Sequence, residues 1–408
     1  MIHSKLMVAM SDSADGSVSN DARSGVGSDG AQVMAGLADR NANLFRRLGI
    51  ALGDPAAWVR LPDGKNIGIV RDLEMDRTRA AGQLDSVHCP ADFPPVSGSA
   101  SGDRETASAQ SVARFLQLQS IEQVVVDRAF PLIYAWHLAD AGISIAYDDD
   151  LGVIDRRVKT DQEIEWLRKA QSVTESVMRQ MCEMIATAEV GSEGRLMVGG
   201  EPLTSERVRT MAAEAFMKRD YTMSHGAIVA TLPESADCHH RGDGDLYTGH
   251  PVIVDLFPRD ESTRYNGDCT RTVVNGTPSE TVQKMHAAVV ASKEAAEAVL
   301  FPGRTGEEVQ LAVEKVLVSH GYPISRGEQT DGPSIQHGTG HGIGLEVHEP
   351  ILLDHGGGEM LAGEVFTVEP GLYGRQDGGV RVEDMLVVTA DGPVNLNQLP
   401  MGLDWNPK

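Results

Sequence analysis

The feature of this sequence that most restricts its fold is an order of segments that occurs twice. The first copy begins with a capping box, TDQE at Thr160, which is followed by apolar residues at helical spacing. A second amphipathic segment follows at 204–218, and the strand-like segment PVIVDLF comes next. The order then returns. TPSE is a further predicted capping box, with Pro278 in the first helical turn, and TGEE at Thr305 opens another amphipathic helix. The strand-like segments EVFTVEPGLYG and GGVRVEDMLVVT follow. The repeat predicts a duplicated α+β unit of two helices followed by strands.

The remainder of the chain has a different composition. Residues 1–34 include a stretch rich in serine, glycine and aspartate with almost nothing to bury, which predicts a disordered tail. Residues 35–157 mix short apolar runs, IGIV and EQVVVD, with the helix-like NANLFRRLGIAL, and we expect a smaller α/β N-terminal domain there. The duplicated unit is expected to occupy 158–408 as a second domain.

The charge and the cysteines exclude several classes of function. The chain has 36 basic and 59 acidic residues, and a net charge of −23 repels phosphate backbones and anionic lipid, so neither nucleic acid nor a membrane is an expected partner. No apolar run is long enough to span a membrane or to act as a secretory signal. The four cysteines are scattered without a CxxC pair, which favours a reducing, cytoplasmic location.

Four acidic residues interrupt segments that should be buried strands. Asp255 lies within VIVDLF, Asp268 precedes CTRT, Glu369 follows FTV, and Glu383 lies within GVRVEDM. A buried carboxylate is costly unless a cation or a metal ion compensates it. The acids are distributed two per half, and His341 lies in the glycine-rich HGTGHGIGLEVH, where glycine permits the turns that point an imidazole inward.

This set of groups favours one kind of chemistry. Four carboxylates and one imidazole suit two divalent cations that share bridging oxygens, with Mn²⁺, Co²⁺ or Zn²⁺ as the candidates. Two such ions about 3.5–4 Å apart can activate a shared water and polarise a carbonyl group. The sequence therefore predicts hydrolysis of an amide or an ester.

Five separated segments, VDLF, GDCTRT, HGTGHGIGLEVHEP, FTVEPGLY and GGVRVEDM, resemble in this order the M24 metallopeptidases of pita-bread fold. The resemblance covers residues 158–390, and that fold is itself a pseudo-symmetric α+β duplication. It implies two divalent metal ions, manganese first and cobalt or zinc as alternatives. In the family pattern Asp268 and Glu383 bridge the two ions, Asp255 completes the shell of one, and His341 and Glu369 complete the shell of the other.

The resemblance also implies roles for residues around the ligands. His348 matches a substrate-facing histidine near the scissile amide, and Glu369 matches the carboxylate that takes a proton from the water. His337 matches an outer histidine of proline-handling members. In DCHHRGD, His239 is implied to lie near the leaving amine, with His240 as the alternative, although cysteine stands where the family has proline.

The subgroup implied is that of the Xaa-Pro aminopeptidases and Xaa-Pro dipeptidases (prolidases). Methionine aminopeptidases usually lack a separate N-terminal domain, which here would be creatinase-N-like, and Tyr373 and Arg381 also match the subgroup. Arg381 is implied to steady the bridging Glu383 through a charge-assisted bond. The expected partners are a peptide substrate and a second copy of the chain in a homodimer. Two alternatives stay open: a methionine aminopeptidase-like specificity, and a non-catalytic peptide-binding protein of the same fold.

The spacing of the two aspartates departs from the family. Asp255 and Asp268 are 13 positions apart (268 − 255), two more than is usual. A turn between two strands can absorb two residues and keep both aspartates on one face, because side chains alternate with a period of two. We therefore expect an intact site with the loop at 258–264 near it.

Overall fold

The computed structural model describes residues 30–96 and 98–407, and the chain divides into two compact units between Leu151 and Gly152. Most of the predicted tail, residues 1–29, lies outside the described residues. Its predicted end at residue 34 is wrong, because strand β1 (Ala31–Leu37) begins earlier and Val33 and Met34 are completely buried in it.

The N-terminal unit is built on one six-stranded mixed sheet with the strand order β4-β3-β2-β1-β5-β6. The apolar runs IGIV and EQVVVD contribute most of β3 and β5. Apolar residues of α3 and α4 pack against the sheet in one core, and residues of α1 pack in another. The elements are β2 (Pro55–Arg60), β3 (Asn66–Ile69), β4 (Ser86–His88), β5 (Gln123–Val126), β6 (Ser144–Tyr147), α1 (Ala42–Leu48), α2 (Met75–Ala80), α3 (Arg104–Leu118) and α4 (Leu132–Asp140).

The short helix α5 (Val153–Arg157) belongs to the C-terminal unit, so the predicted boundary after residue 157 lies too late. Its basic residues explain the difference. Arg156 forms ion pairs of 2.7 Å with Glu346 and 3.2 Å with Glu349, and Arg157 pairs with Glu364. These contacts attach α5 to the second unit.

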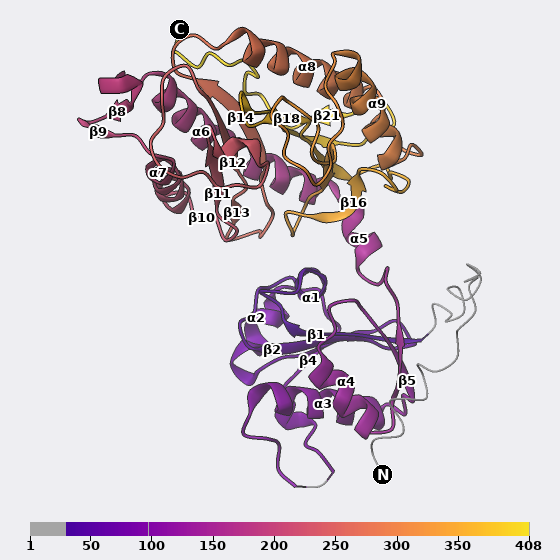
Figure 1. Ribbon diagram of the computed structural model, residues 1–408. Helices are drawn as coiled ribbons and strands as arrows, with labels where there is room; N and C mark the ends of the chain where they lie inside the picture. Colours follow the sequence, from indigo (N-terminus) through magenta and orange to yellow (C-terminus); the bar gives the residue numbers. More distant parts are fainter. Residues whose placement is uncertain (1–29, 97, 408) are drawn as a thin grey trace. The chain divides into compact units, whose positions relative to one another are not determined.

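The C-terminal unit confirms the predicted duplication (Figure 1). Two helices precede an antiparallel sheet in each half, and the strand orders are β11-β12-β14 in the first half and β16-β15-β17-β20-β21 in the second. The first half consists of α6 (Asp161–Ala186), α7 (Ser205–Met217), β11 (Ala227–Ala230), β12 (Pro251–Leu256) and β14 (Cys269–Val274). The second consists of α8 (Glu280–Glu297), α9 (Gly306–Ser319), β15 (Gly340–Gly342), β16 (Glu349–Leu353), β17 (Val365–Val368), β20 (Asp384–Val387) and β21 (Val394–Asn395).

The helix starts follow the capping signals with one exception. Thr160 and Thr305 each form a complete capping box, as predicted. The predicted box at TPSE is wrong: Ser279 is the N-cap and its side chain accepts from the backbone N–H of Val282, so α8 begins only at Glu280. Among the described residues, no helix is long and apolar enough to cross a membrane.

The β12–β14 hairpin shows how the extra residues are accommodated. Asp255 lies opposite Thr270 in the ladder, and the intervening loop forms β13 (Arg259–Asp260), which pairs with β10 (Tyr221–Thr222). The loop is also fixed to α6, because the hydroxyl of Tyr265 donates to Glu163 at 2.6 Å. The extra residues thus form structure of their own without changing the register of the hairpin.

Candidate metal centre

The structure brings all five predicted metal ligands into one cluster. The donor atoms of Asp268, His341 and Glu383 lie within 4.8 Å of one another. Nε2 of His341 is also 3.6 Å from a carboxylate oxygen of Glu369. Asp255, the fifth predicted ligand, is connected to the cluster through the guanidinium of Arg381. Nη2 of Arg381 is 2.6 Å from a carboxylate oxygen of Asp255, and Nε is 3.9 Å from one of Glu369.

Strand alternation explains why these side chains meet. Asp255 in β12 is opposite Thr270 in β14, and Asp268 precedes Thr270 by two residues, so all three share one face. The opposite face of β12 carries Val252 and Val254, which are buried in a core with apolar residues of α6 and α7. Burying the apolar face against the helices therefore directs the acids toward the second half of the unit.

The second half places its own donors in strands or directly beside them. His341 is in β15, Glu369 directly follows β17, and Glu383 lies between β19 (Gly378–Arg381) and β20. The close strand pairing leaves no room for a side chain beside the histidine. A Cβ atom added to Gly340 would lie 2.0 Å from the carbonyl oxygen of Thr367, which gives a physical reason for this glycine.

The acids carry more negative charge than the site can balance. Burial, together with repulsion from the neighbouring carboxylates, raises the pKa values of Asp268 and Glu383 well above their ordinary range. Burial and the charge of Asp255 raise the pKa of Glu369 to about 8, although the cation Arg381 opposes the shift. One oxygen of Asp255, Oδ1, is buried and has no hydrogen-bond partner among the described residues.

The histidine presents a lone pair to these acids. Nδ1 of His341 lies 3.1 Å from the carbonyl oxygen of Gly342, and because a carbonyl only accepts, Nδ1 must carry the proton. Burial lowers the pKa of His341 to about 3, so the ring is neutral and Nε2 is unprotonated. An unprotonated nitrogen that faces carboxylate oxygens is repelled by them unless a proton or a metal cation lies between them. The donor set therefore fits divalent metal ions with oxygen and nitrogen ligands.

A chain of hydrogen bonds connects this cluster to two further predicted residues. Nη1 of Arg381 donates to the hydroxyl oxygen of Tyr373 at 2.9 Å, and that hydroxyl is 2.6 Å from Nε2 of His337. Nδ1 of His337 donates to the carbonyl of Gly338, so Nε2 accepts from the tyrosine. Burial and the charge of Arg381 lower the pKa of His337 to about 3, which keeps this ring neutral.

The predicted partner of Arg381 is wrong. The guanidinium pairs with Asp255 and not with Glu383, because β12 and β19 lie against each other in the fold. The carboxylate of Glu383 instead accepts from the hydroxyl of Thr270 at 2.7 Å, and Nε of Arg381 donates to that same hydroxyl oxygen at 3.2 Å.

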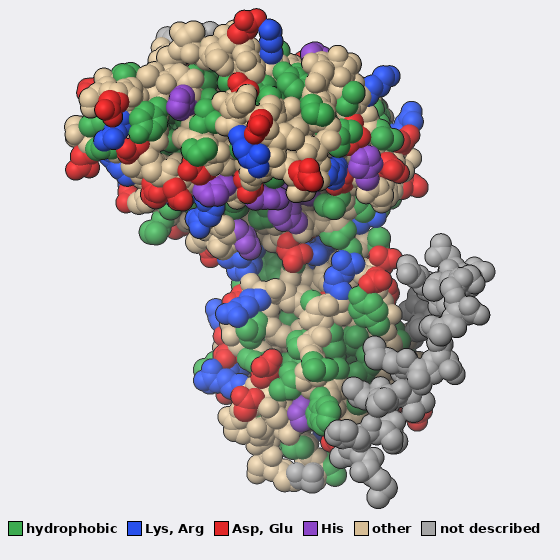
Figure 2. Space-filling model, in the orientation of Figure 1, with side chains coloured by type: hydrophobic (Ala, Val, Ile, Leu, Met, Phe, Trp, Pro, Cys, Tyr) green, Lys and Arg blue, Asp and Glu red, His purple; other side chains and the backbone are tan. Residues whose placement is uncertain are grey.

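The other predicted histidines lie at the surface of the site. The ring of His348 is edge-on to His341 with centroids 4.3 Å apart, and burial followed by the charges of His225 and His239 lowers the pKa of His348. His239 is exposed and within electrostatic reach of His348, whereas Nδ1 of His240 accepts from the N–H of Gly242 in a local turn. Figure 2 shows histidine side chains gathered on one part of the surface of this unit.

Three residues near the site were not singled out from the sequence. Thr270 could have been found, since it lies two positions after Asp268 in the same strand. Gln171 holds the backbone of Asp268 on both sides, donating to its carbonyl at 2.7 Å and accepting from its N–H at 2.9 Å. Its signal was a polar residue on the buried face of α6. His225 lies in the β10–β11 loop, and no pattern marked it.

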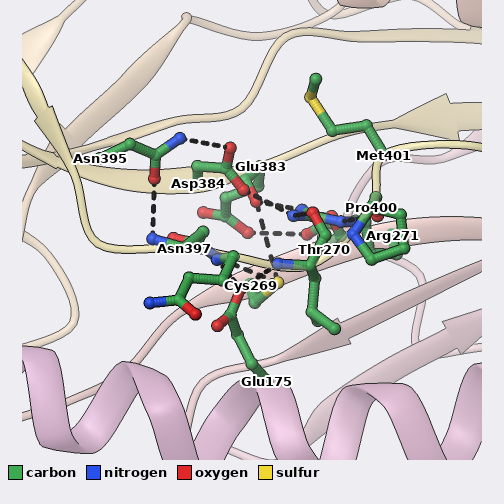
Figure 3. Close-up of polar contacts among 12 residues, drawn as sticks. Glu175, Cys269, Thr270, Arg271, Glu383, Asp384, Asn395, Asn397, Pro400 and Met401 are labelled. Carbon is green, nitrogen blue, oxygen red and sulfur yellow. Dashed lines mark hydrogen bonds and ion pairs between the residues drawn. The ribbon is translucent and has the colours of Figure 1, made fainter.

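A second buried charge cluster begins at the next residue after Glu383 (Figure 3). Asp384 lies 2.7 Å from Arg271 and 2.8 Å from Lys293, and all three side chains are buried. Arg271 also donates to the carbonyl groups of Glu383, Leu399 and Pro400. This second cluster, which we call the Asp384 cluster, therefore fixes both the backbone of Glu383 and the backbone of residues 399–400.

The chain was compared with known proteins and structures. Residues 165–390 match the family model described as metallopeptidase family M24. The probable dipeptidase PepE of Mycobacterium tuberculosis is 31% identical over 278 residues, which cover 67% of this chain and 68% of that protein. The Xaa-Pro dipeptidase of Pyrococcus furiosus is 30% identical over 247 residues, 60% of this chain and 64% of that protein.

Solved structures agree with the fold over most of the chain. The X-Pro aminopeptidase of Thermotoga maritima superimposes with a TM-score of 0.73 at 21% identity, covering 91% of this chain and 96% of that chain. The dipeptidase PepE of Mycobacterium ulcerans gives a TM-score of 0.69 at 25% identity, covering 91% and 92%. The predicted pita-bread fold is confirmed, and the chain belongs to metallopeptidase family M24.

Proposed function

We propose that this protein is an exopeptidase that removes the N-terminal residue of peptides, at Xaa-Pro bonds, with two divalent metal ions held by Asp255, Asp268, His341, Glu369 and Glu383. The observation that carries the proposal is the convergence of Asp268, Glu369 and Glu383 on the unprotonated Nε2 of His341, with Asp255 beside them on the cation Arg381. The names of the relatives, a Xaa-Pro dipeptidase and an X-Pro aminopeptidase among them, support the substrate class. Manganese is the proposed metal, with cobalt or zinc as alternatives.

The side chains around the ions supply the remaining chemistry. Two bound cations would acidify a water molecule and polarise the carbonyl of the scissile bond. Glu369 is the proposed general base, because its carboxylate is partly exposed at the cluster and can accept a proton from the attacking water. His348 is proposed to donate a hydrogen bond to the peptide beside the scissile amide, and His239 is proposed to face the leaving amine.

The hydrogen-bonded chain of Arg381, Tyr373 and His337 is proposed to hold the wall of the substrate site. Arg381 fixes the ligand Asp255 at 2.6 Å, and Tyr373 is completely buried between Arg381 and His337. Groups held from both sides lose little conformational entropy when a substrate binds. His240 is proposed to stabilise the turn after His239 and not to contact the peptide.

Two alternatives are separated from this proposal by direct assay. The purified protein should be analysed for metal and then given Xaa-Pro dipeptides, Xaa-Pro-Yaa peptides and Met-Ala-type peptides. Hydrolysis at Xaa-Pro bonds is the expected result. Cleavage of the methionyl peptides alone would indicate a methionine aminopeptidase-like specificity, and cleavage of none would favour a non-catalytic peptide-binding role.

The same assay tests whether His341 is a metal ligand and His348 a substrate-contacting residue. His348→Ala should retain metal and lower turnover by roughly 10²–10⁴-fold, the usual contribution of a positioned proton-transfer group. Loss of metal from this variant would show that His348 is a ligand and that the assignment of His341 is incomplete.

We also propose a homodimer that uses apolar surface of the N-terminal unit. Leu132 and Trp136 in α4 and Tyr147 in the edge strand β6 are 79%, 55% and 61% exposed, and exposed large apolar side chains that lie together mark interaction surfaces. Because the chain is acidic, an apolar interface predicts a dimer that is unchanged or strengthened as salt rises. Light scattering at low and high ionic strength measures this, and a monomer under both conditions contradicts it. A cytoplasmic location remains a prediction.

A further inference from the structure

We propose that Asp237, Cys238 and His239 form a separate binding site for one soft divalent cation such as zinc, at the edge of the metal centre. The three residues occupy the turn that follows the short helix η5 (Glu234–Ala236). Their donor atoms, a carboxylate oxygen, a sulfur and an imidazole nitrogen, all lie within 4.8 Å of one another. None of them belongs to the ligand set of the main centre.

The distance between two of the donors has the value that tetrahedral zinc requires. Sγ of Cys238 is 3.7 Å from Nδ1 of His239. Bonds of about 2.3 Å to sulfur and 2.0–2.1 Å to nitrogen at a tetrahedral angle place the two donors about 3.6 Å apart. Without a cation the same contact is a weak S–H to nitrogen hydrogen bond. On binding, the thiol releases its proton to solvent and ligates as a thiolate.

The turn is held in place from several sides. Nη1 of Arg381 donates to the carbonyl oxygen of Cys238 at 3.2 Å, and Nε2 of Gln336 donates to that of Ala236 at 3.1 Å. The N–H of His239 donates to Oδ1 of Asp237 at 2.9 Å, which orients the carboxylate within the turn. These contacts use the backbone and leave the thiol and the imidazole as ligands, so little reorganisation is needed on binding.

The exposure of the residues suits a site that opens to solvent. Cys238 is half-buried and His239 is exposed, so water can complete a four-coordinate shell. The two metal sites also differ in chemistry. The main centre offers oxygen and nitrogen donors, whereas this turn offers a thiolate, which selects zinc or cadmium over manganese. A protein with manganese in the main centre can therefore bind a softer ion here.

Occupation of the turn has a consequence for catalysis, and this part rests on the proposed function. His239 is the residue proposed to face the leaving amine, and a cation on its Nδ1 fixes the ring toward Cys238. The ion would then also lie beside the metal centre, since Arg381 contacts both the carbonyl oxygen of Cys238 and the carboxylate of Asp255. Zinc in excess of the main centre is thus expected to inhibit hydrolysis reversibly, with Cys238 setting its affinity.

The test adds cadmium chloride to the manganese-loaded full chain and records the ultraviolet thiolate-to-cadmium charge-transfer band. Oxygen and nitrogen ligands give no such band, so exchange at the main centre does not interfere. Cys89→Ser is the matched control, since Cys89 is the other half-buried cysteine, whereas Cys182 and Cys269 are buried. We expect one equivalent of cadmium to saturate the band in the wild type and in Cys89→Ser, and no band in Cys238→Ser.

Two more variants distinguish a built site from a reactive surface thiol. Asp237→Asn and His239→Gln should each bind cadmium at least about tenfold more weakly, since loss of a mere outer-shell partner of a metal site costs 10–100-fold. Wild-type affinity in both variants would overturn the proposal, as would a full band in Cys238→Ser.

Peptide hydrolysis gives the second readout. Zinc should inhibit the wild type and Cys89→Ser at concentrations that leave Cys238→Ser active. Equal inhibition of all three overturns the inhibitory role. A protein that forms the band but cleaves no Xaa-Pro peptide refutes the proposed function and leaves the binding site supported, so the two failures are distinguishable.

Discussion

The metal centre and the Asp384 cluster are two buried groups of charges that meet at adjacent residues of one chain, Glu383 and Asp384. In the Asp384 cluster one carboxylate has two cations, Arg271 and Lys293, and although burial opposes the shift they lower its pKa. In the metal centre four carboxylates share one guanidinium, and burial with mutual repulsion raises the pKa values of three of them. Carboxylates that are similarly buried thus have pKa values shifted in opposite directions, according to the number of cations beside them.

This difference separates a structural cluster from a binding site. The Asp384 cluster contains its own counter-charges and hydrogen-bond donors, so it is complete as folded (Figure 3). The metal centre lacks counter-charge, and one of its carboxylate oxygens has no partner among the residues that the structure describes. A cation from solution would supply the positive charge that the chain does not provide there.

The largest effect is expected at the bridging ligands. Asp268→Ala and Glu383→Ala should each abolish hydrolysis and lower the metal content, because each removes a donor that both ions would share. Metal analysis after gel filtration and an Xaa-Pro peptide assay measure this. Asp331→Asn, at an exposed ion pair with Arg375, is the control and should leave both unchanged. A bridging variant that keeps two ions per chain and near wild-type turnover contradicts the centre.

The second effect concerns the stability of the metal-free protein, which removal of a carboxylate should change in opposite directions in the two clusters. Asp384→Asn leaves the buried Arg271 without its carboxylate and leaves Lys293 with Glu297 alone. It should lower the stability by about 3–5 kcal/mol, the usual cost of breaking a buried ion pair. Asp268→Asn removes a repelling carboxylate and should leave the melting temperature unchanged or raise it. Calorimetry of both variants after chelation decides the matter.

With metal bound, the effect of Asp268→Asn on the melting temperature should reverse. Asp268→Asn should now melt below the wild type, because it loses the stabilisation that the bound ions supply. If both variants destabilise the metal-free protein equally, the centre is charge-balanced without metal, and the comparison fails.

The smallest effect is a dependence of stability on pH. Glu369 has a pKa of about 8 in the folded chain against an ordinary 4.5, so the folded chain keeps a proton that the unfolded chain releases. The metal-free protein should therefore lose stability as pH rises from 6.5 to 8, by at most about 1.4 kcal/mol per pH unit from this group. His337 and His341 have pKa values lowered to about 3, so they make the protein more stable as pH rises, and only below about pH 6.5.

Melting temperatures at several pH values between 6.5 and 8 measure the slope. It should shrink in Glu369→Gln and in the metal-loaded wild type, where a cation replaces the proton. A slope that is the same in all three samples would assign the dependence to other groups.

The sequence was sufficient to select the acids and the histidine that the fold brings together, and insufficient to identify their hydrogen-bond and ion-pair partners. Asp255, Asp268, Glu369 and Glu383 were recognisable because an acid inside an apolar strand is costly, and β12 and β14 keep the side-chain alternation that this inference assumed. Thr160 and Thr305 marked their helices because an N-cap is a local interaction.

What the sequence did not reveal depends on which strands become neighbours. Arg381 is two residues from Glu383 in the chain, yet it pairs with Asp255 across the β12–β19 contact, and nothing local encodes that choice. The same holds for Gln171, whose two bonds to the backbone of Asp268 join residues 97 positions apart. The start of β1 was misplaced because its polar neighbours dominate the composition of that region.

The origin of the ligands also affects the lifetime of the protein. Asp255 and Asp268 come from one half of the duplicated unit, and His341, Glu369 and Glu383 come from the other. Without metal, repulsion among the carboxylates across the junction of the halves would favour local opening, which would expose backbone to cellular proteases. A cell short of the metal would therefore hold less of this protein as well as a less active form of it.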